Sequence, residues 1–216
     1  MKGAKRAHTV FLISPARCNG GRAGSLLTSK TSRMGKQLRT HGAPLGELMT
    51  WLSALYFRGK LTYAQAFAQV TTGVPGSLIM AAGLGLRAPE TVISAEQFVT
   101  MGDTDIESDA FVEPLSRDAR VLDAIAGPDA RVVLLGSIAT GKYVDPLLDV
   151  FGERLLFPGC FVGRGDMSRG GLLLRASRSG EPLEYTPIRG ATLHGVRPPK
   201  LPKLPRQSAG SASRPS

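Results

Sequence analysis

Cysteines, aromatic residues and long hydrophobic runs are all scarce in this chain of 216 residues. Two cysteines are too few for a disulfide framework, a four-thiolate metal site or an iron–sulfur cluster. No run of 18 apolar residues exists, and the apolar run 10–13 is too short for the core of a secretory signal. We therefore expect a cytoplasmic protein with no membrane-spanning segment, and we expect it to need no metal and no cofactor.

Apolar residues are nevertheless frequent enough for a real core. They make up 42% of the chain, which excludes wholesale disorder, and the length suits one domain of ordinary size. The formal net charge is +10, so the basic residues require an explanation.

The positive charge is unevenly distributed. Residues 197–216 hold five basic side chains and no acidic one, and residues 1–9 hold three. Residues 10–60 carry eight basic side chains against one acidic side chain, whereas residues 90–123 carry nine acidic side chains against two arginines. This pattern predicts a surface that grips a polyanion such as DNA on one face, and the alternative is ordinary solvated surface charge.

The end of the chain, residues 193–216, is rich in proline and in serine, alanine and glycine. Repeated proline favours polyproline II, so we expect a disordered, linker-like tail outside the fold. Its Pro199, Pro202 and Pro205 have the spacing of an SH3-like ligand, and its basic residues are able to contact nucleic acid phosphates.

Residues 8–192 read as a single α/β domain. Continuous apolar runs, typical of strands buried on both faces, occupy residues 8–14, 77–82, 131–136 and 154–158. Helical patterns occupy residues 23–38, 46–56, 63–70, 112–125 and 143–151. Buried strands alternating with helices predict a three-layer domain with a mostly parallel central sheet.

Ligands of such sheets bind outside the carboxyl ends of the strands, and the loop that follows the first strand has a suitable composition. Consecutive glycines allow backbone N–H groups to approach a ligand, Asn19 offers an amide for a water or a base edge, and Arg17 and Arg22 suit phosphates. The alternative is a tight turn with exposed arginines. The candidate residues are Ser14, Arg17, Asn19, Gly20, Gly21 and Arg22.

A second loop, residues 136–143, nearly matches the phosphate-binding P-loop between a strand and a helix. Tyr143 stands where that motif needs a serine or threonine for Mg²⁺. We therefore expect Gly136 and Lys142 to contact a phosphate or the backbone, and a P-loop-like nucleotide-handling enzyme is a minor alternative.

A third loop, residues 157–171, contains five glycines and one carboxylate between two arginines. An Asp166 held ionised by these arginines suits activation of water or stabilisation of a cation, although the pairing also fits a purely structural role. Arg164, Ser168 and Arg169 are further candidates for binding a base or a phosphate. We expect the three loops to converge on one pocket with positively charged walls.

Three segments of the chain resemble a family of small bacterial domains with the uracil-DNA-glycosylase-like fold. They are the first strand and its Ser14-Pro15-Ala16 turn, the segment 78–89, which is similar to a family motif with the pattern SAxxGLxxP, and residues 133–143 with their strand–Gly–Tyr pattern. The resemblance spans roughly residues 8–160. It implies a DNA glycosylase, and some members of the wider group are thought to act on modified bases in defence against phage.

The resemblance also implies roles for single residues. Asn19 corresponds to the residue that orients water in such enzymes. Residues 157–159 correspond to a later His-Pro-Ser loop without its histidine, so Asp166, Ser168 or Arg169 would take that role. The prediction is a hydrolase with Asn19 and Asp166 as its catalytic residues, and the main alternative is a non-catalytic nucleic-acid-binding or regulatory module.

Overall fold

A six-stranded sheet forms the centre of the computed structural model, which describes residues 7–138, 141, 143–192 and 194–202. The strand order is β4-β3-β1-β6-β7-β8, in which the four inner strands are parallel and the two edge strands are antiparallel to their neighbours. The strands are β1 (Thr9–Ile13), β3 (Ser77–Ala81), β4 (Gly85–Arg87), β6 (Arg131–Leu135), β7 (Leu155–Pro158) and β8 (Tyr185–Pro187). The expected mostly parallel α/β sheet is therefore confirmed.

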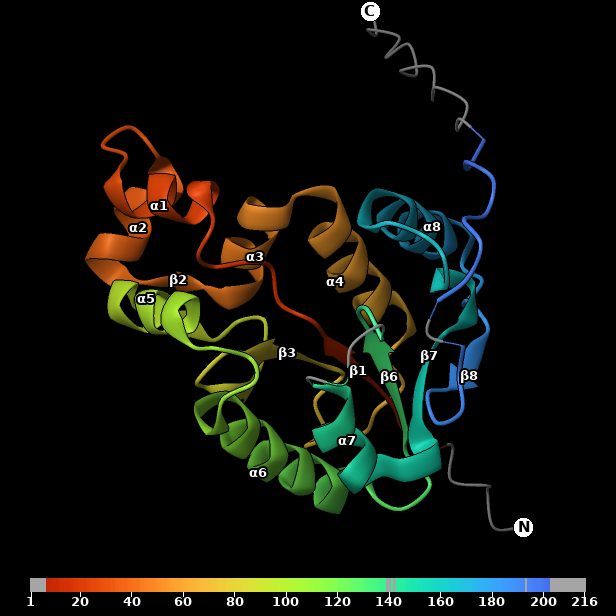
Figure 1. Cartoon of the computed structure of the whole chain (residues 1–216). Helices are drawn as coiled ribbons and strands as arrows, with labels where there is room; N and C mark the ends of the chain where they lie inside the picture. The colour runs from red at the N-terminus through yellow and green to blue at the C-terminus, as the bar shows by residue number, and fades with distance from the viewer. Residues whose placement is uncertain (1–6, 139–140, 142, 193, 203–216) are drawn as a thin grey trace, which may run out of the picture.

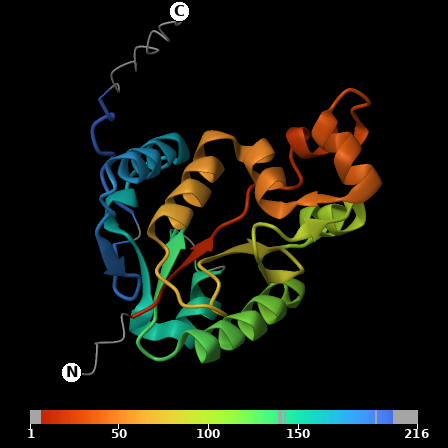
Figure 2. The same cartoon turned by 180° about the vertical axis from the view of Figure 1, so that it is seen from behind.

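Helices cover both faces of this sheet, which is compatible with a three-layer domain (Figure 1). Helices α4 and α8 lie on one face and α6 and α7 on the other, and the view from behind agrees (Figure 2). The remaining helices form a lobe beyond the carboxyl ends of the strands, together with the short pair β2 (Ala43–Pro44) and β5 (Val92–Ile93). The helices are α1 (Gly21–Thr28), α2 (Arg33–His41), α3 (Leu45–Ser53), α4 (Leu55–Phe67), α5 (Ala95–Asp103), α6 (Asp109–Ala126), α7 (Val144–Phe151) and α8 (Asp166–Ser179).

The central strand β1 explains why the sheet forms where it does. All five of its residues are buried, because β3 and β6 pair with its two edges and helices pack on its two faces. Strand β6 continues the pattern with four buried residues of five. A continuous apolar run is stable only in such a doubly covered position, which is how the sequence predicted these strands.

Two helix predictions were wrong in their extent. The single helix expected over residues 23–38 is divided into α1 and α2, because the hydroxyl of Ser32 accepts from Gly35 N and starts a new helix. The guanidinium of Arg39 then donates to the carbonyls of Leu26, Leu27 and Ser29 at the end of α1. The separate helices expected over 46–56 and 63–70 are instead α3 and the longer α4.

Helices α4 and α8 are packed unusually closely, and two glycines make this possible. A Cβ atom on Gly59 would lie 2.9 Å from Gly170 O, and a Cβ on Gly170 would lie 2.9 Å from Tyr56 Cα. Backbone therefore meets backbone at this crossing. The contact sets the position of the start of α8 relative to the side chains of α4.

Replacing Gly170 with alanine is expected to destabilise the protein. The added methyl group would push the two backbones apart at a cost of about 1–3 kcal/mol, more than the roughly 1 kcal/mol that alanine contributes through its helix propensity. Urea unfolding of Gly170→Ala measures the loss. Gly171→Ala is the matched control, because the atom closest to its added methyl is the flexible Leu201 Cδ1. Equal stability of the two variants would contradict the close contact.

The first part of the expected tail has a defined path. Residues 194–202 form neither helix nor strand, but Arg164 donates to Pro199 O, Arg175 donates to Pro202 O, and Leu201 lies beside Gly171. This segment therefore runs along α8. Residues 203–216 lie outside the described part of the chain. Within the described ranges, no helix is long and apolar enough to cross a membrane.

Candidate functional site

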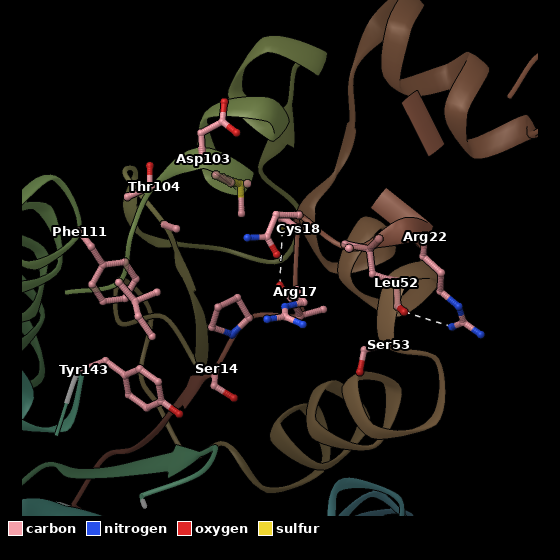
Figure 3. Close-up of a pocket in the computed structure, with 18 of the residues that line it drawn as sticks. Ser14, Arg17, Cys18, Arg22, Leu52, Ser53, Asp103, Thr104, Phe111 and Tyr143 are labelled. Carbon is pink, nitrogen blue, oxygen red and sulfur yellow. Dashed lines mark hydrogen bonds between the residues drawn. The ribbon is translucent and has the colours of Figure 1, made fainter. Parts of the chain in front are cut away.

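A cavity of about 870 Å³ lies at the carboxyl ends of β1 and β6, between the sheet and the lobe (Figure 3). Its lining comes from the loop after β1, from α3 and α4, from the end of α5 and the residues after it, from Ser137 and Tyr143 after β6, and from the start of α8. Its volume lies within the range of ligand sites in proteins. The position is the one expected for a parallel sheet.

The view in Figure 3 gives the arrangement of the walls. Arg22, Leu52 and Ser53 lie on one side and Phe111 and Tyr143 on the other, with Ser14 between them at the strand end. The segment after α5 adds a further edge of the opening. A ligand in the cavity would therefore meet apolar and polar walls facing each other.

The six candidate residues of the first loop all line this cavity. Arg17 and Asn19 are exposed at its opening, and the Arg22 guanidinium donates to Leu52 O at 3.1 Å. The loop approaches α5 closely, because a Cβ on Gly102 would lie 2.9 Å from Cys18 O. Gly102 therefore allows the lobe to form the opposite wall.

Asp166 lines the same cavity from the opposite end of the sequence. It occupies the first turn of α8, its side chain is 70% exposed, and its carboxylate lies 3.7 Å from the Arg169 guanidinium. The structure therefore brings Asn19 and Asp166 to one cavity. The expected loop 157–171 is partly helical, since α8 begins within it.

The other candidates of the third loop lie outside the lining. Arg164 donates to Cys160 O, to the Ser168 hydroxyl and to Pro199 O, so it ties the loop to the segment 194–202. Arg169 donates to Phe161 O and forms an ion pair with Asp166, and its charge also acts on the cavity residues Tyr56 and Lys60. Arg164 and Ser168 support the start of α8 rather than the surface of the cavity.

The P-loop-like segment contributes differently from the expectation. Gly136 is buried against Ser14, where a Cβ would lie 2.8 Å from Ser14 Cβ, so this glycine serves the close approach of two strand ends. The Tyr143 hydroxyl donates to Ser137 O at 2.8 Å. Lys142 lies outside the described residues.

Sequence reasoning missed two residues of α4 that form the deepest part of the site. Lys60 is 2% exposed, and its Nζ donates to Ser14 O at 2.6 Å and to Ser14 Oγ at 3.0 Å. Burial lowers the pKa of Lys60 to about 7; the Asp166 carboxylate opposes this shift and the Arg169 guanidinium adds to it. The Arg169 guanidinium interacts with the buried Tyr56 hydroxyl, whose own proton has no acceptor within the described part of the chain.

The signal for Lys60 was present in the sequence. Tyr56, Phe57, Tyr63 and Ala64 are spaced as one buried face of a helix, and Lys60 falls on the same face. A lysine in an apolar stripe is rarely buried without a function or a partner. Burial also raises the pKa of the Tyr56 hydroxyl well above its usual range, so this hydroxyl stays protonated.

The charge of the cavity differs from the expectation of positive walls. Asp103, the last residue of α5, and Asp105, two residues further on, join Asp166 in the lining and oppose the two arginines and Lys60. The walls therefore carry both signs. These two aspartates belong to the acidic segment 90–123, and α5 was missed although Ser94 and Gln97 form a capping box at its start.

No family model, no curated protein and no solved structure matches this chain.

Proposed function

We propose that this protein is a DNA glycosylase, which hydrolyses the N-glycosidic bond of a base turned out of the DNA helix and leaves an abasic site. The observation that carries the proposal is the meeting of Asn19 and Asp166, an amide and an exposed carboxylate from distant segments, on one cavity at the carboxyl ends of parallel strands. A three-layer α/β domain is also compatible with the uracil-DNA-glycosylase-like fold that the sequence resembles, including enzymes for modified bases.

The cavity is suited to an extruded nucleotide. A base must leave the stack before its glycosidic bond is accessible, and it needs a pocket with an apolar wall and a few polar groups. Phe111, Met101 and Ile106 supply the apolar wall, and the Asn19 amide supplies a donor and an acceptor for the base edge. Exposed Arg17 and Arg22 at the opening suit the flanking phosphates.

Asp166 supplies the chemistry of bond cleavage. As the base departs, the sugar gains positive charge at C1′, and a carboxylate beside it stabilises that charge or takes a proton from the attacking water. The Arg169 contact at 3.7 Å holds the carboxylate without covering it, since the Asp166 side chain remains 70% exposed. The exposed Asp166 carboxylate is therefore free to meet the sugar of a nucleotide in the cavity.

Hydrolysis of free nucleosides is the second candidate, and the mixed charge of the walls favours it. Asp103, Asp105 and Asp166 balance the basic side chains of the cavity, and a nucleoside without phosphates avoids repulsion by these carboxylates. The bond cleaved and the role of Asp166 are the same in both candidates. They differ in whether the substrate is a polymer.

One experiment separates the candidates. The protein is incubated with unmodified DNA and with hypermodified phage DNA, and alkali then cleaves the strands at abasic sites; a parallel reaction measures free base released from nucleosides. A glycosylase produces alkali-labile breaks that Asn19→Ala reduces and that Gln65→Ala, which removes an exposed amide elsewhere on α4, leaves unchanged. Release of base from nucleosides alone assigns the second candidate. Salt-dependent DNA binding without breaks or free base contradicts both.

A further inference from the structure

Lys60 lies at the floor of the cavity in an environment that is unusual for a lysine. Its Nζ is 4.4 Å from the centroid of the Tyr56 ring and 5.0 Å from that of Phe57, and its two hydrogen bonds go to neutral oxygens of Ser14. The hydrolysis described above makes no use of this amine. Burial of an ammonium group is costly, so its place on the lining of the cavity points to a role.

The surroundings favour the neutral, nucleophilic amine. Desolvation lowers the pKa of Lys60 to about 7, so that a large share of molecules carries an unprotonated amine at neutral pH. A neutral amine has two N–H bonds and one lone pair. The two contacts with Ser14 use both N–H bonds and leave the lone pair for an electrophile. Desolvated lysines of this kind form Schiff bases with carbonyl substrates.

We propose that Lys60 forms a Schiff base with C1′ of an abasic deoxyribose held in the cavity, which makes the protein an abasic-site lyase as well as a glycosylase. The inference rests on the proposed function, because base removal within the same cavity generates the sugar aldehyde. Lys60, Asn19 and Asp166 all line this cavity, so the product of the first reaction is the substrate of the second.

The Tyr56 hydroxyl also lies at this floor. It lines the cavity, its residue is only 6% exposed, and the Arg169 guanidinium interacts with its oxygen. A guanidinium only donates, so the hydroxyl proton of Tyr56 has no acceptor among the described residues. An oxygen of the sugar seated above Lys60 would accept this proton.

The bonds made and broken balance without a further reactant. The Lys60 amine adds to the aldehyde carbon C1′ of the ring-opened sugar, and the aldehyde oxygen leaves as water with the two hydrogens of the amine. The Asp166 carboxylate takes a proton from C2′, and the C3′–O bond breaks, so that the 3′ phosphate departs with its electron pair. The proton passes from Asp166 to the departing phosphate or to solvent, and water hydrolyses the imine, which returns Lys60 and the unsaturated aldehyde.

Trapping with borohydride tests the inference without depending on which base is recognised. The full chain is mixed with an oligonucleotide that holds one preformed abasic site, and borohydride reduces the imine to a stable amine. We expect a covalent protein–DNA complex whose modified peptide, found by mass spectrometry, carries the DNA remnant on Lys60. Lys60→Met should abolish the complex, whereas Lys36→Met, at an exposed lysine of α2, should leave it unchanged.

The mass-spectrometric position decides the matter even if Lys60→Met does not fold, because it is measured on the unaltered chain. No complex, or a complex on another amine, overturns the lyase inference. If base release from intact DNA is then still observed, the glycosylase stands alone. A complex on Lys60 without any base release supports the lyase and contradicts the proposed base hydrolysis.

Discussion

Replacing Asp166 with asparagine is expected to lower the rate of base release by about 100-fold or more, with DNA binding retained. A positioned acid or base contributes roughly 10²–10⁴-fold to the rate, and asparagine keeps the shape of the side chain but supplies neither the charge nor the proton acceptor. The side chain is 70% exposed and its ion pair with Arg169 spans 3.7 Å, so the fold should be nearly unaffected. Single-turnover kinetics on the DNA that gives alkali-labile breaks in the incubation experiment measure the effect.

Asp103→Asn is the matched control for this prediction. Asp103 lines the same cavity from the lobe, so it shares the electrostatic environment but lies on a different segment from α8. Its replacement should change the rate by a few-fold at most. An equal loss in both variants would mean that the carboxylates act only through their charge, which contradicts a specific role for Asp166.

Replacing Lys60 with methionine is expected to change how stability depends on pH. The pKa of Lys60 is about 7 in the folded protein and 10.5 for an ordinary lysine, so between these values the unfolded chain binds more protons than the folded one. Stability from this group therefore rises with pH above about 7, by about 1 kcal/mol per pH unit. Methionine does not titrate, so Lys60→Met should lack this rise.

Urea unfolding at pH 7 and pH 8.5 measures the difference. Buried tyrosines and cysteines also have raised pKa values, but they titrate at higher pH and are common to both proteins. Lys36→Met should keep the slope of the unaltered chain, because this lysine is exposed. The same slope in Lys60→Met would mean that Lys60 keeps an ordinary pKa in the fold.

The sheet could be predicted from the sequence because its inner strands are buried on both faces. Strands β1, β3 and β6 are continuous apolar runs, and no other position in a globular domain suits such a run as well. The edge strands β4 and β8 have only three residues each, too few for a pattern. The break between α3 and α4 at Ala54 depends on a positive φ of 45°. Alanine rarely adopts this conformation, so the sequence gives no signal for the break.

The candidate site could be predicted only where the local composition departs from what a packed core requires. Asn19 and its neighbouring glycines stand in a loop that no core requirement explains, and Asp166 is the one acid of its segment. The directions of Arg164 and Ser168 could not be predicted, because they depend on contacts with residues 194–202. Asp105 and Asp103 reach the cavity through the position of a whole lobe, which is a tertiary property.

The glycine crossing of α4 and α8 has a consequence for any effort to redesign the cavity of this protein. Lys60 and Asp166 stand on different helices, and the separation between them is fixed by two main chains in contact at Gly59 and Gly170 rather than by adjustable side chains. Reshaping the cavity for another ligand is therefore best done through the lobe. The helix crossing should be left unchanged, because it fixes the separation between the amine and the carboxylate.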